Sequence, residues 1–176
     1  EFRDIEIKNA YRDFVGGGIL DEETLLKFVN AIGRDNARFP MHWDDSDNAG
    51  FTTGTPWISV NENYKKINAA AQVNDPDSIF SYYKKLIELR HQMEIIVYGV
   101  YKSKAIEHPD VFAYTRTLGD EKLFVVCNFR EQEMDFTLED GFTGDEKVLI
   151  SNYDDVVKTE NGIYLRPYEA KVFYRK

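Results

Sequence analysis

Cysteine is nearly absent from the sequence: Cys127 is the only one in 176 residues, so the chain cannot form an internal disulfide. This usage favours a reducing compartment, and we expect a cytoplasmic protein. The sequence also has no run near the roughly 18 consecutive apolar residues that a membrane-spanning helix needs, so we expect no membrane partner. Because it begins at Glu1 and not at Met, we expect a segment of a longer protein.

Positive charge is scarce as well. Lys and Arg number 22 against 31 Asp and Glu, which leaves a net charge of −9. Nucleic-acid binding depends on clustered cations, and the sequence has no basic stripe, so we expect no nucleic-acid partner. Apolar residues are abundant by contrast: 43% of the chain is hydrophobic and 14% is aromatic. This composition predicts a globular protein with a sizeable core.

The chain changes character near Met93 and Glu94, from helical signals to strand signals. Asp21 can cap a helix with acidic residues in its first turn, and the stretch Asp75-Pro76-Asp77-Ser78 is a strong helix start. Between these helices, residues 36–72 read as one long loop. β-branched and aromatic runs predict strands at Ile95–Tyr101, Val111–Thr117, Lys122–Phe129, Met134–Leu138, Lys147–Ser151 and Ala170–Tyr174, with a hairpin turn at 118–121. The sequence therefore predicts an α+β chain that ends in a small antiparallel β-domain.

Residue patterns alone identify no catalytic centre. The acidic stretch from Asp44 to Gly50 superficially resembles a calcium loop, but Ala49 and Pro56 stand where oxygen ligands are required, so a polar loop is the better interpretation and we expect no metal site. His42, His91 and His108 lack metal-ligand spacing, and Cys127 lies in an apolar strand. With 31 acidic residues, spacing cannot select a pair of carboxylates for glycoside hydrolysis.

A longer motif is far more specific. Residues 33–44, Gly-Arg-Asp-Asn-Ala-Arg-Phe-Pro-Met-His-Trp-Asp, are followed at 48–57 by Asn-Ala-Gly-Phe-Thr-Thr-Gly-Thr-Pro-Trp. This stretch closely resembles the region around the eighth barrel strand of the bacterial oligo-1,6-glucosidases and dextran glucosidases, in the α-amylase superfamily (glycoside hydrolase family 13). The resemblance extends to Phe2–Glu6 before the motif and to Leu165–Ala170 near the end of the chain. Phe39 and His42 depart from the group, which usually has Thr and Gln there, so the exact substrate stays open.

The resemblance implies a fold and a division into domains. Residues 1–93 would be the end of a (β/α)₈ TIM barrel, its helices and last strand, and residues 94–176 would be an antiparallel β-sandwich C-terminal domain. A full barrel takes roughly 250 residues, so most of it would lie outside this chain. The family's nucleophilic Asp, acid/base Glu and stabilising Asp would lie there too, and we expect no catalytic residue and no cofactor within residues 1–176.

Three residues match sugar-binding positions of the family. Arg34 resembles the arginine that binds the terminal glucose beside the nucleophile, where a guanidinium fork suits neighbouring hydroxyls. Glu6 matches an acid that contacts the next sugar. Arg38 is a candidate supporting residue. Without the resemblance, all three would read as surface salt-bridge residues.

The function implied is that of a segment of a retaining, exo-acting α-glucosidase that hydrolyses short α-1,6-linked glucosides in bacterial carbohydrate metabolism. The segment alone is expected to be inactive, and its partners would be α-glucosides and the rest of the barrel. Two alternatives stay open: a segment of a trehalose-6-phosphate hydrolase or sucrose isomerase, or a non-catalytic carbohydrate-binding module.

Overall fold

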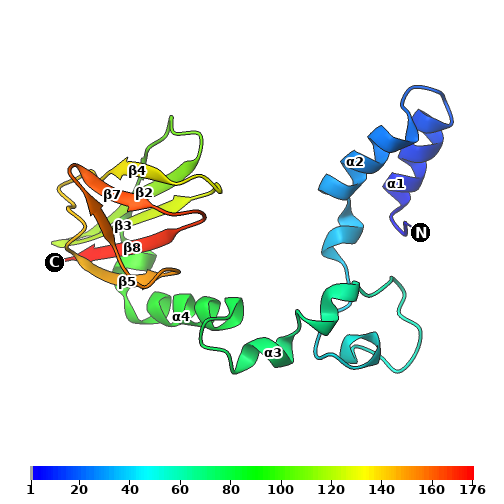
Figure 1. Cartoon of the computed structure of the whole chain (residues 1–176), viewed down its shortest axis with the longest axis horizontal. Coiled ribbons are helices and arrows are strands. Elements are labelled where there is room, and N and C mark those ends of the chain that lie inside the picture. Colours follow the sequence, from blue (N-terminus) through cyan, green and yellow to red (C-terminus); the bar gives the residue numbers. More distant parts are fainter. Residues whose placement is uncertain (1) are drawn as a thin grey trace. The chain divides into compact units, whose positions relative to one another are not determined.

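The computed structural model describes residues 2–176 (Figure 1). The chain divides into two compact units, the first ending at Tyr83 and the second running from Lys84 to Lys176. The division falls inside helix α4 (Ile79–Gln92). The domain boundary at residues 93 and 94, at the end of that helix, stays a prediction.

The first unit consists of helices joined by long irregular segments. Its elements are α1 (Ile5–Ala10), the π-turn η1 (Tyr11–Val15), α2 (Glu22–Ile32), the 3₁₀ turns η2 (Arg34–Ala37), η3 (Asp47–Gly50) and η4 (Glu62–Lys65), α3 (Ala69–Val73) and the start of α4. As predicted, Asp21 caps α2, because its carboxylate accepts the Thr24 amide hydrogen at 2.8 Å. Ile7 of α1 packs against Leu25 and Val29 of α2 to form a small buried cluster.

The loop between α2 and α3 has defined turns. Asn48, Ala49 and Gly50 are three consecutive residues with positive φ, at 54°, 58° and 65°. The Asp44 carboxylate closes this turn by accepting the Ser46 amide hydrogen at 2.8 Å, and a Cβ on Gly50 would lie 2.7 Å from that carboxylate. Glycine is therefore required at position 50 for both its conformation and its size.

No strand precedes Val100 in the described part of the chain, so the prediction of a barrel strand within residues 1–93 was wrong. Pro40, Gly50, Gly54 and Pro56 interrupt this region, and the structure builds short turns there instead of a ladder. The strand predicted at Ile95–Tyr101 was also wrong in its first half. Residues Glu94–Tyr98 form helix α5, which buries Ile95 completely and ends at Gly99.

The second unit is an antiparallel β-sandwich. One sheet has the strand order β1 (Val100–Lys104), β2 (Val111–Leu118), β3 (Glu121–Asn128), β8 (Ala170–Arg175) and β5 (Lys147–Ser151). The other has the order β4 (Met134–Thr137), β7 (Gly162–Leu165) and β6 (Val157–Thr159). The hairpin predicted at 118–121 joins β2 and β3, with Gly119 at a φ of 59°. Strands β6 and β7 were not predicted.

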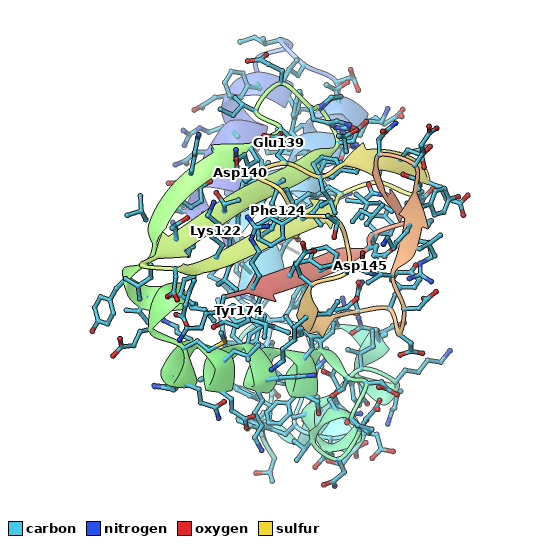
Figure 2. The ribbon with its side chains drawn as sticks, turned by 90° about the vertical axis from the view of Figure 1, so that its left-hand side faces the viewer. Lys122, Phe124, Glu139, Asp140, Asp145 and Tyr174 are labelled. Carbon is cyan, nitrogen blue, oxygen red and sulfur yellow. The ribbon has the colours of Figure 1, made fainter. Side chains whose placement is uncertain are left out.

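The sandwich core lies between the two sheets. Val126 and Phe124 of β3 and Phe173 of β8 face Ile163 and Leu165 of β7, and all five are fully buried. Figure 2 shows Lys122 and Phe124 along β3 and Tyr174 on the neighbouring β8. On the outer face of the five-stranded sheet, Leu86 and Leu89 of α4 and Ile96 of α5 share a cavity of about 90 Å³ with strand residues.

Candidate functional site

The segment that carries Arg34 is set by the end of α2. The Gly33 amide donates to the Val29 carbonyl at 2.8 Å, and a Cβ on Gly33 would lie 2.5 Å from that same oxygen. Asn36 folds back and donates its side-chain amide to the Asn30 carbonyl at 2.9 Å. Because these contacts satisfy carbonyls at the helix end, the chain turns sharply into η2 and brings Arg34 beside the start of α1.

Asp35 fastens this turn to the N-terminal segment. One of its carboxylate oxygens accepts the amide hydrogens of Arg3, at 2.8 Å, and of Asp4, at 3.2 Å. The other forms a close ion pair with Arg38. Burial raises the pKa of Asp35, but the hydrogen bonds from Arg3, Arg38 and Asp4 outweigh it, so the pKa lies below its ordinary value. Asp35 is therefore ionised at neutral pH. It links the turn η2 to the backbone of Arg3 and Asp4, about 30 positions earlier in the sequence.

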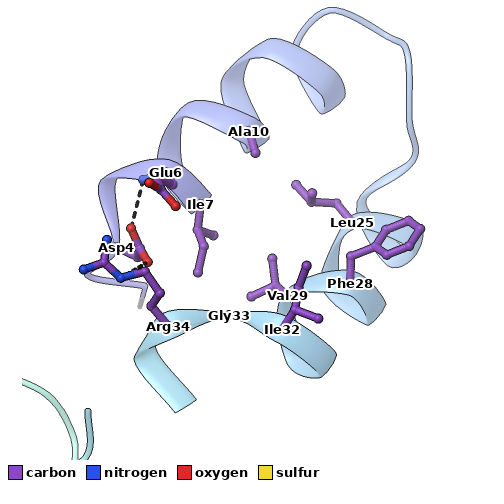
Figure 3. Close-up of a pocket in the computed structure, with 10 residues that line it drawn as sticks. All are labelled: Asp4, Glu6, Ile7, Ala10, Leu25, Phe28, Val29, Ile32, Gly33 and Arg34. Atoms are coloured by element: carbon purple, nitrogen blue, oxygen red, sulfur yellow. Dashed lines mark hydrogen bonds and ion pairs between the residues drawn. The ribbon is translucent and has the colours of Figure 1, made fainter. Parts of the chain in front are cut away.

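Asp4 lies where the three predicted site residues meet. Only 4% of this residue is exposed. Its Oδ1 accepts the Glu6 amide hydrogen at 3.0 Å, which caps α1. Its Oδ2 lies 4.0 Å from Nε of Arg34 and 3.9 Å from an Nη of Arg38. Figure 3 shows Asp4 between Glu6 and Arg34. The structure thus brings together Glu6, Arg34 and Arg38.

Glu6 and Arg34 border one open pocket of about 210 Å³ between α1 and α2. The Arg34 side chain is 63% exposed, and its two Nη groups have no partner among the described residues. The Glu6 carboxylate likewise has no hydrogen bond or ion pair within residues 2–176. A free guanidinium fork and a free carboxylate can donate to and accept from hydroxyl groups of one ligand. The rest of the pocket is apolar, lined by Ile7, Ala10, Leu25, Phe28, Val29, Ile32 and Gly33 together with Asp4.

Arg38 is more enclosed than Arg34. It pairs with Asp35, and its guanidinium carbon lies 5.4 Å from the centre of the Trp57 ring. Its Nε is buried and has no partner among the described residues. These contacts hold Arg38 beside Asp4, and its supporting role stays a prediction.

Residue patterns did not identify Asp4 or Asp35. Their only local signal is the position of Asp4 two residues before Glu6, where a helix cap is common. The contact between Asp35 and the Arg3–Asp4 backbone joins segments about 30 residues apart, and no spacing rule in the sequence predicts it.

The two departures from the family motif lie in a second groove. Phe39 and His42 line it with Ile67, Gln72 and Phe80, and its volume is about 330 Å³. Nδ1 of His42 donates to the Ile67 carbonyl at 3.1 Å, and the other ring nitrogen is Nε2. That nitrogen is buried and has no partner among residues 2–176.

Other candidate chemistry is not assembled in the described residues. Within residues 2–176, no group of three His, Cys, Asp or Glu side chains is placed to hold a metal ion. In the same part of the chain, no helix is both long and apolar enough to cross a membrane. Burial raises the pKa of the Cys127 thiol, which keeps the less nucleophilic protonated form at neutral pH.

Comparison with known proteins adds two family matches. A model of the alpha-amylase catalytic domain matches residues 12–99, which is half of the chain. A model of the C-terminal domain of the alpha-amylase SusG matches residues 111–172. The first match spans the motif region and the second spans most of the β-sandwich.

Several named proteins are similar to this chain over nearly its whole length. The oligo-1,6-glucosidase of Parageobacillus thermoglucosidasius is 50% identical over 175 residues, which cover 98% of this chain and 31% of that protein. The trehalose-6-phosphate hydrolase of Bacillus subtilis (strain 168) is 42% identical over 175 residues, covering 98% and 31%. The crystal structure of the isomaltulose synthase SmuA from Protaminobacter rubrum superimposes with a TM-score of 0.91 at 43% identity, covering 99% of this chain and 31% of that one. The chain therefore spans about a third of the length of these relatives.

Proposed function

The chain belongs to the α-amylase family, and from this premise we propose that it is a segment of a retaining, exo-acting α-glucosidase that hydrolyses short α-1,6-linked glucosides. In this proposal, residues up to 93 complete a (β/α)₈ barrel and residues 94–176 are its C-terminal sandwich domain. The catalytic carboxylates belong to the part of the enzyme outside residues 1–176. The parent enzyme acts in the cytoplasm.

One observation carries the proposal. Glu6 and Arg34, which are far apart in the sequence, lie on either side of the buried Asp4 carboxylate and keep their own polar groups free at one pocket. Groups that bind one ligand must be held in a fixed relation to each other. The arrangement supports Arg34 and Glu6 as sugar-binding residues and Arg38 as their support.

The chemistry of each group fits a sugar. Arg34 would donate from its two free Nη groups to neighbouring hydroxyls of the terminal glucose, which a planar fork can do at fixed geometry. Glu6 would accept hydrogen bonds from hydroxyls of the next sugar. Retaining hydrolysis needs a nucleophilic carboxylate and an acid/base about 5 Å apart, and binding residues such as these hold the glucosidic bond between them.

The choice of an α-1,6 linkage rests on similarity. Relatives named oligo-1,6-glucosidase are 44% to 50% identical to this chain, while one named trehalose-6-phosphate hydrolase is 42% identical. Phe39 and His42 line a groove of their own, and they are the positions at which the motif itself departs from the group.

A substrate panel tests the proposal. For the full-length protein that contains this chain, kcat/KM is measured on isomaltose, trehalose 6-phosphate and sucrose, and NMR follows the anomer released from isomaltose. We expect isomaltose to be the best substrate and α-glucose to form first. Preference for trehalose 6-phosphate, or conversion of sucrose to an isomer, would favour the corresponding relative instead.

A second assay separates an enzyme segment from a carbohydrate-binding module. Isomaltose is titrated into the 176-residue chain while the fluorescence of Trp43 and Trp57 is followed. The chain alone lacks the part of the proposed site that carries the nucleophile. We therefore expect no saturable change in fluorescence up to millimolar isomaltose. Saturable binding by the chain alone would favour the module.

A further inference from the structure

We propose that Asp4 is a positioning residue that orients Arg34 and Glu6 together for sugar binding, an inference that rests on the function proposed above. Asp4 itself is too enclosed to be a sugar ligand: 4% of it is exposed, and both carboxylate oxygens face groups of the protein. Its effect on substrate therefore passes through the two residues it contacts.

The contact with Arg34 is an ion pair at the inner edge of the guanidinium. Oδ2 of Asp4 lies 4.0 Å from Nε, the nitrogen nearest the chain, and neither Nη group has a partner among the described residues. An exposed arginine samples many rotamers, and fixing it costs conformational entropy that sugar binding would otherwise have to offset. A buried anion beside Nε restricts the side chain before sugar arrives. The two outer donors stay free for a ligand.

The contact with Glu6 acts through the backbone. Oδ1 of Asp4 accepts the Glu6 amide hydrogen at 3.0 Å and so fixes the first residues of α1, from which the Glu6 side chain extends. One carboxylate thus sets the position of a cation on η2 and of an acid on α1. Loss of the Asp4 charge should disturb the contact of Arg34 with sugar, and loss of the acceptor for the Glu6 amide should disturb the contact of Glu6.

Arg34 depends on Asp4 more than Arg38 does. Arg38 has a second anion, Asp35, and lies over the Trp57 ring. Among the described residues, Asp4 is the only carboxylate within 4.0 Å of the Arg34 guanidinium. Loss of the Asp4 charge leaves Arg38 paired but leaves Arg34 without an anionic contact.

A double-mutant cycle in the full-length enzyme tests this inference. Asp4→Asn keeps the shape and the acceptor for the Glu6 amide but removes the charge, and Arg34→Ala removes the proposed recipient. We expect Asp4→Asn to lower kcat/KM for an aryl α-glucoside by about tenfold, since a small displacement of a positioning group has effects of this order. In the Arg34→Ala background, Asp4→Asn should lower kcat/KM by less than twofold. A merely structural role would give the same loss in both backgrounds.

Asp21→Asn is the matched control. Asp21 caps the neighbouring helix α2 with the same kind of hydrogen bond, at 2.8 Å, and contacts neither Arg34 nor Glu6. We expect its kcat/KM to stay within twofold of the parent. Asp4→Ser, which retains a good helix cap without the charge, replaces Asp4→Asn if that variant fails to fold.

The outcomes separate the two proposals. If Arg34→Ala lowers kcat/KM by 30-fold or more while the Asp4 variant stays within twofold of the parent, the positioning role is wrong and the proposed function stands. An equal loss from the Asp4 change in both backgrounds also overturns the positioning role. If Arg34→Ala itself has no effect, the sugar-binding assignment is wrong.

Discussion

Glu169 and Lys171 form an ion pair inside the β-sandwich, where their side chains are 0% and 1% exposed. Lys171 is the cross-strand partner of Val126 on β3, so its side chain lies on the core face of the sheet. Arg166 donates from Nε and Nη2 to the two oxygens of the same Glu169 carboxylate, each at 3.0 Å. Lys171 also donates to the Asp155 carbonyl at 2.7 Å. One buried acid therefore compensates two cations.

Removing that acid should be far more damaging than removing the lysine. Glu169→Gln leaves the buried Lys171 without its carboxylate partner, while Arg166 keeps its ion pair with Asp155 at 2.7 Å. We expect the free energy of unfolding to fall by about 3–5 kcal/mol. Lys171→Met should lower the free energy of unfolding by clearly less, because Arg166 still donates to both carboxylate oxygens of Glu169. Urea denaturation of the 176-residue chain, followed by a spectroscopic signal from the β-sandwich, compares the unfolding free energies of the two variants. Equal losses would show that Arg166 does not compensate Glu169.

Lys171 should also give the sandwich a pH-dependent stability. Burial, together with the nearby Arg166 cation, lowers the pKa of Lys171 from 10.5 to about 8. Between these values the unfolded chain holds a proton that the folded chain has released, so this residue adds stability as the pH rises through the window. We expect the difference in unfolding free energy between the parent and Lys171→Met to grow from pH 8 to pH 10.

Lys104 provides the opposite case as a control. Its ammonium donates to Asp140 at 2.9 Å and to Glu139 at 3.2 Å, two residues labelled in Figure 2. The hydrogen bond to Asp140 is the main reason that the pKa of Lys104 lies above its ordinary value. Lys104 is therefore charged in the folded state and mostly charged in the unfolded state from pH 8 to pH 10, and the difference between the parent and Lys104→Met should stay nearly constant. A constant difference for Lys171→Met as well would contradict the lowered pKa.

The two units should differ in local stability. Strand β3 is paired on both sides, by β2 and β8, and contributes Phe124 and Val126 to a core of ten buried residues. Helix α2 contributes two residues to a cluster of three, and Phe28 and Ile32 on it are exposed. Amide exchange on the isolated chain should show strong protection at 122–128 and weak protection at 21–32. Stronger protection of the helix would mean that the first unit has a core of its own.

The sequence predicted best the elements whose signals are local. A capping residue and apolar periodicity located α2 and α4, and Gly119 marked the hairpin between β2 and β3. Residues 95–98 were misread as a strand because their β-branched run favours one, whereas burial of Ile95 by tertiary packing selects a helix. Strands β6 and β7 are three and four residues long, too short for an alternation pattern to show.

The residues of the candidate site were also predicted only in part. Arg34, Glu6 and Arg38 came from a motif that resembles a known family, not from their chemistry. Asp4 and Asp35, which bring them together, act across about 30 residues of chain, and one-dimensional patterns carry no such contact. Buried acids of this kind become visible only when the partners of each polar group are known.

The 176-residue chain alone should not hydrolyse p-nitrophenyl α-glucoside. Stabilising the transition state requires the nucleophile and the acid/base, which the proposed function assigns to the rest of the enzyme. We expect no turnover above background, with the full-length protein as the positive control. Turnover that disappears when a carboxylate within residues 1–176 is replaced would mean that the chain has a catalytic residue of its own.

The role of Arg34 can be separated from that of Glu6 with two variants and two substrates of the full-length enzyme. Arg34→Lys keeps the charge but loses the planar fork, so it should remain defective on both isomaltose and an aryl glucoside. Losing charge-assisted, desolvated hydrogen bonds costs about 2–4 kcal/mol, a fall in kcat/KM of roughly 30- to 1000-fold. Glu6→Gln should harm isomaltose cleavage more, because an aryl leaving group makes none of the contacts of a second sugar. An Arg34→Lys enzyme within about threefold of the parent on both substrates would reduce Arg34 to a salt-bridge residue of Asp4.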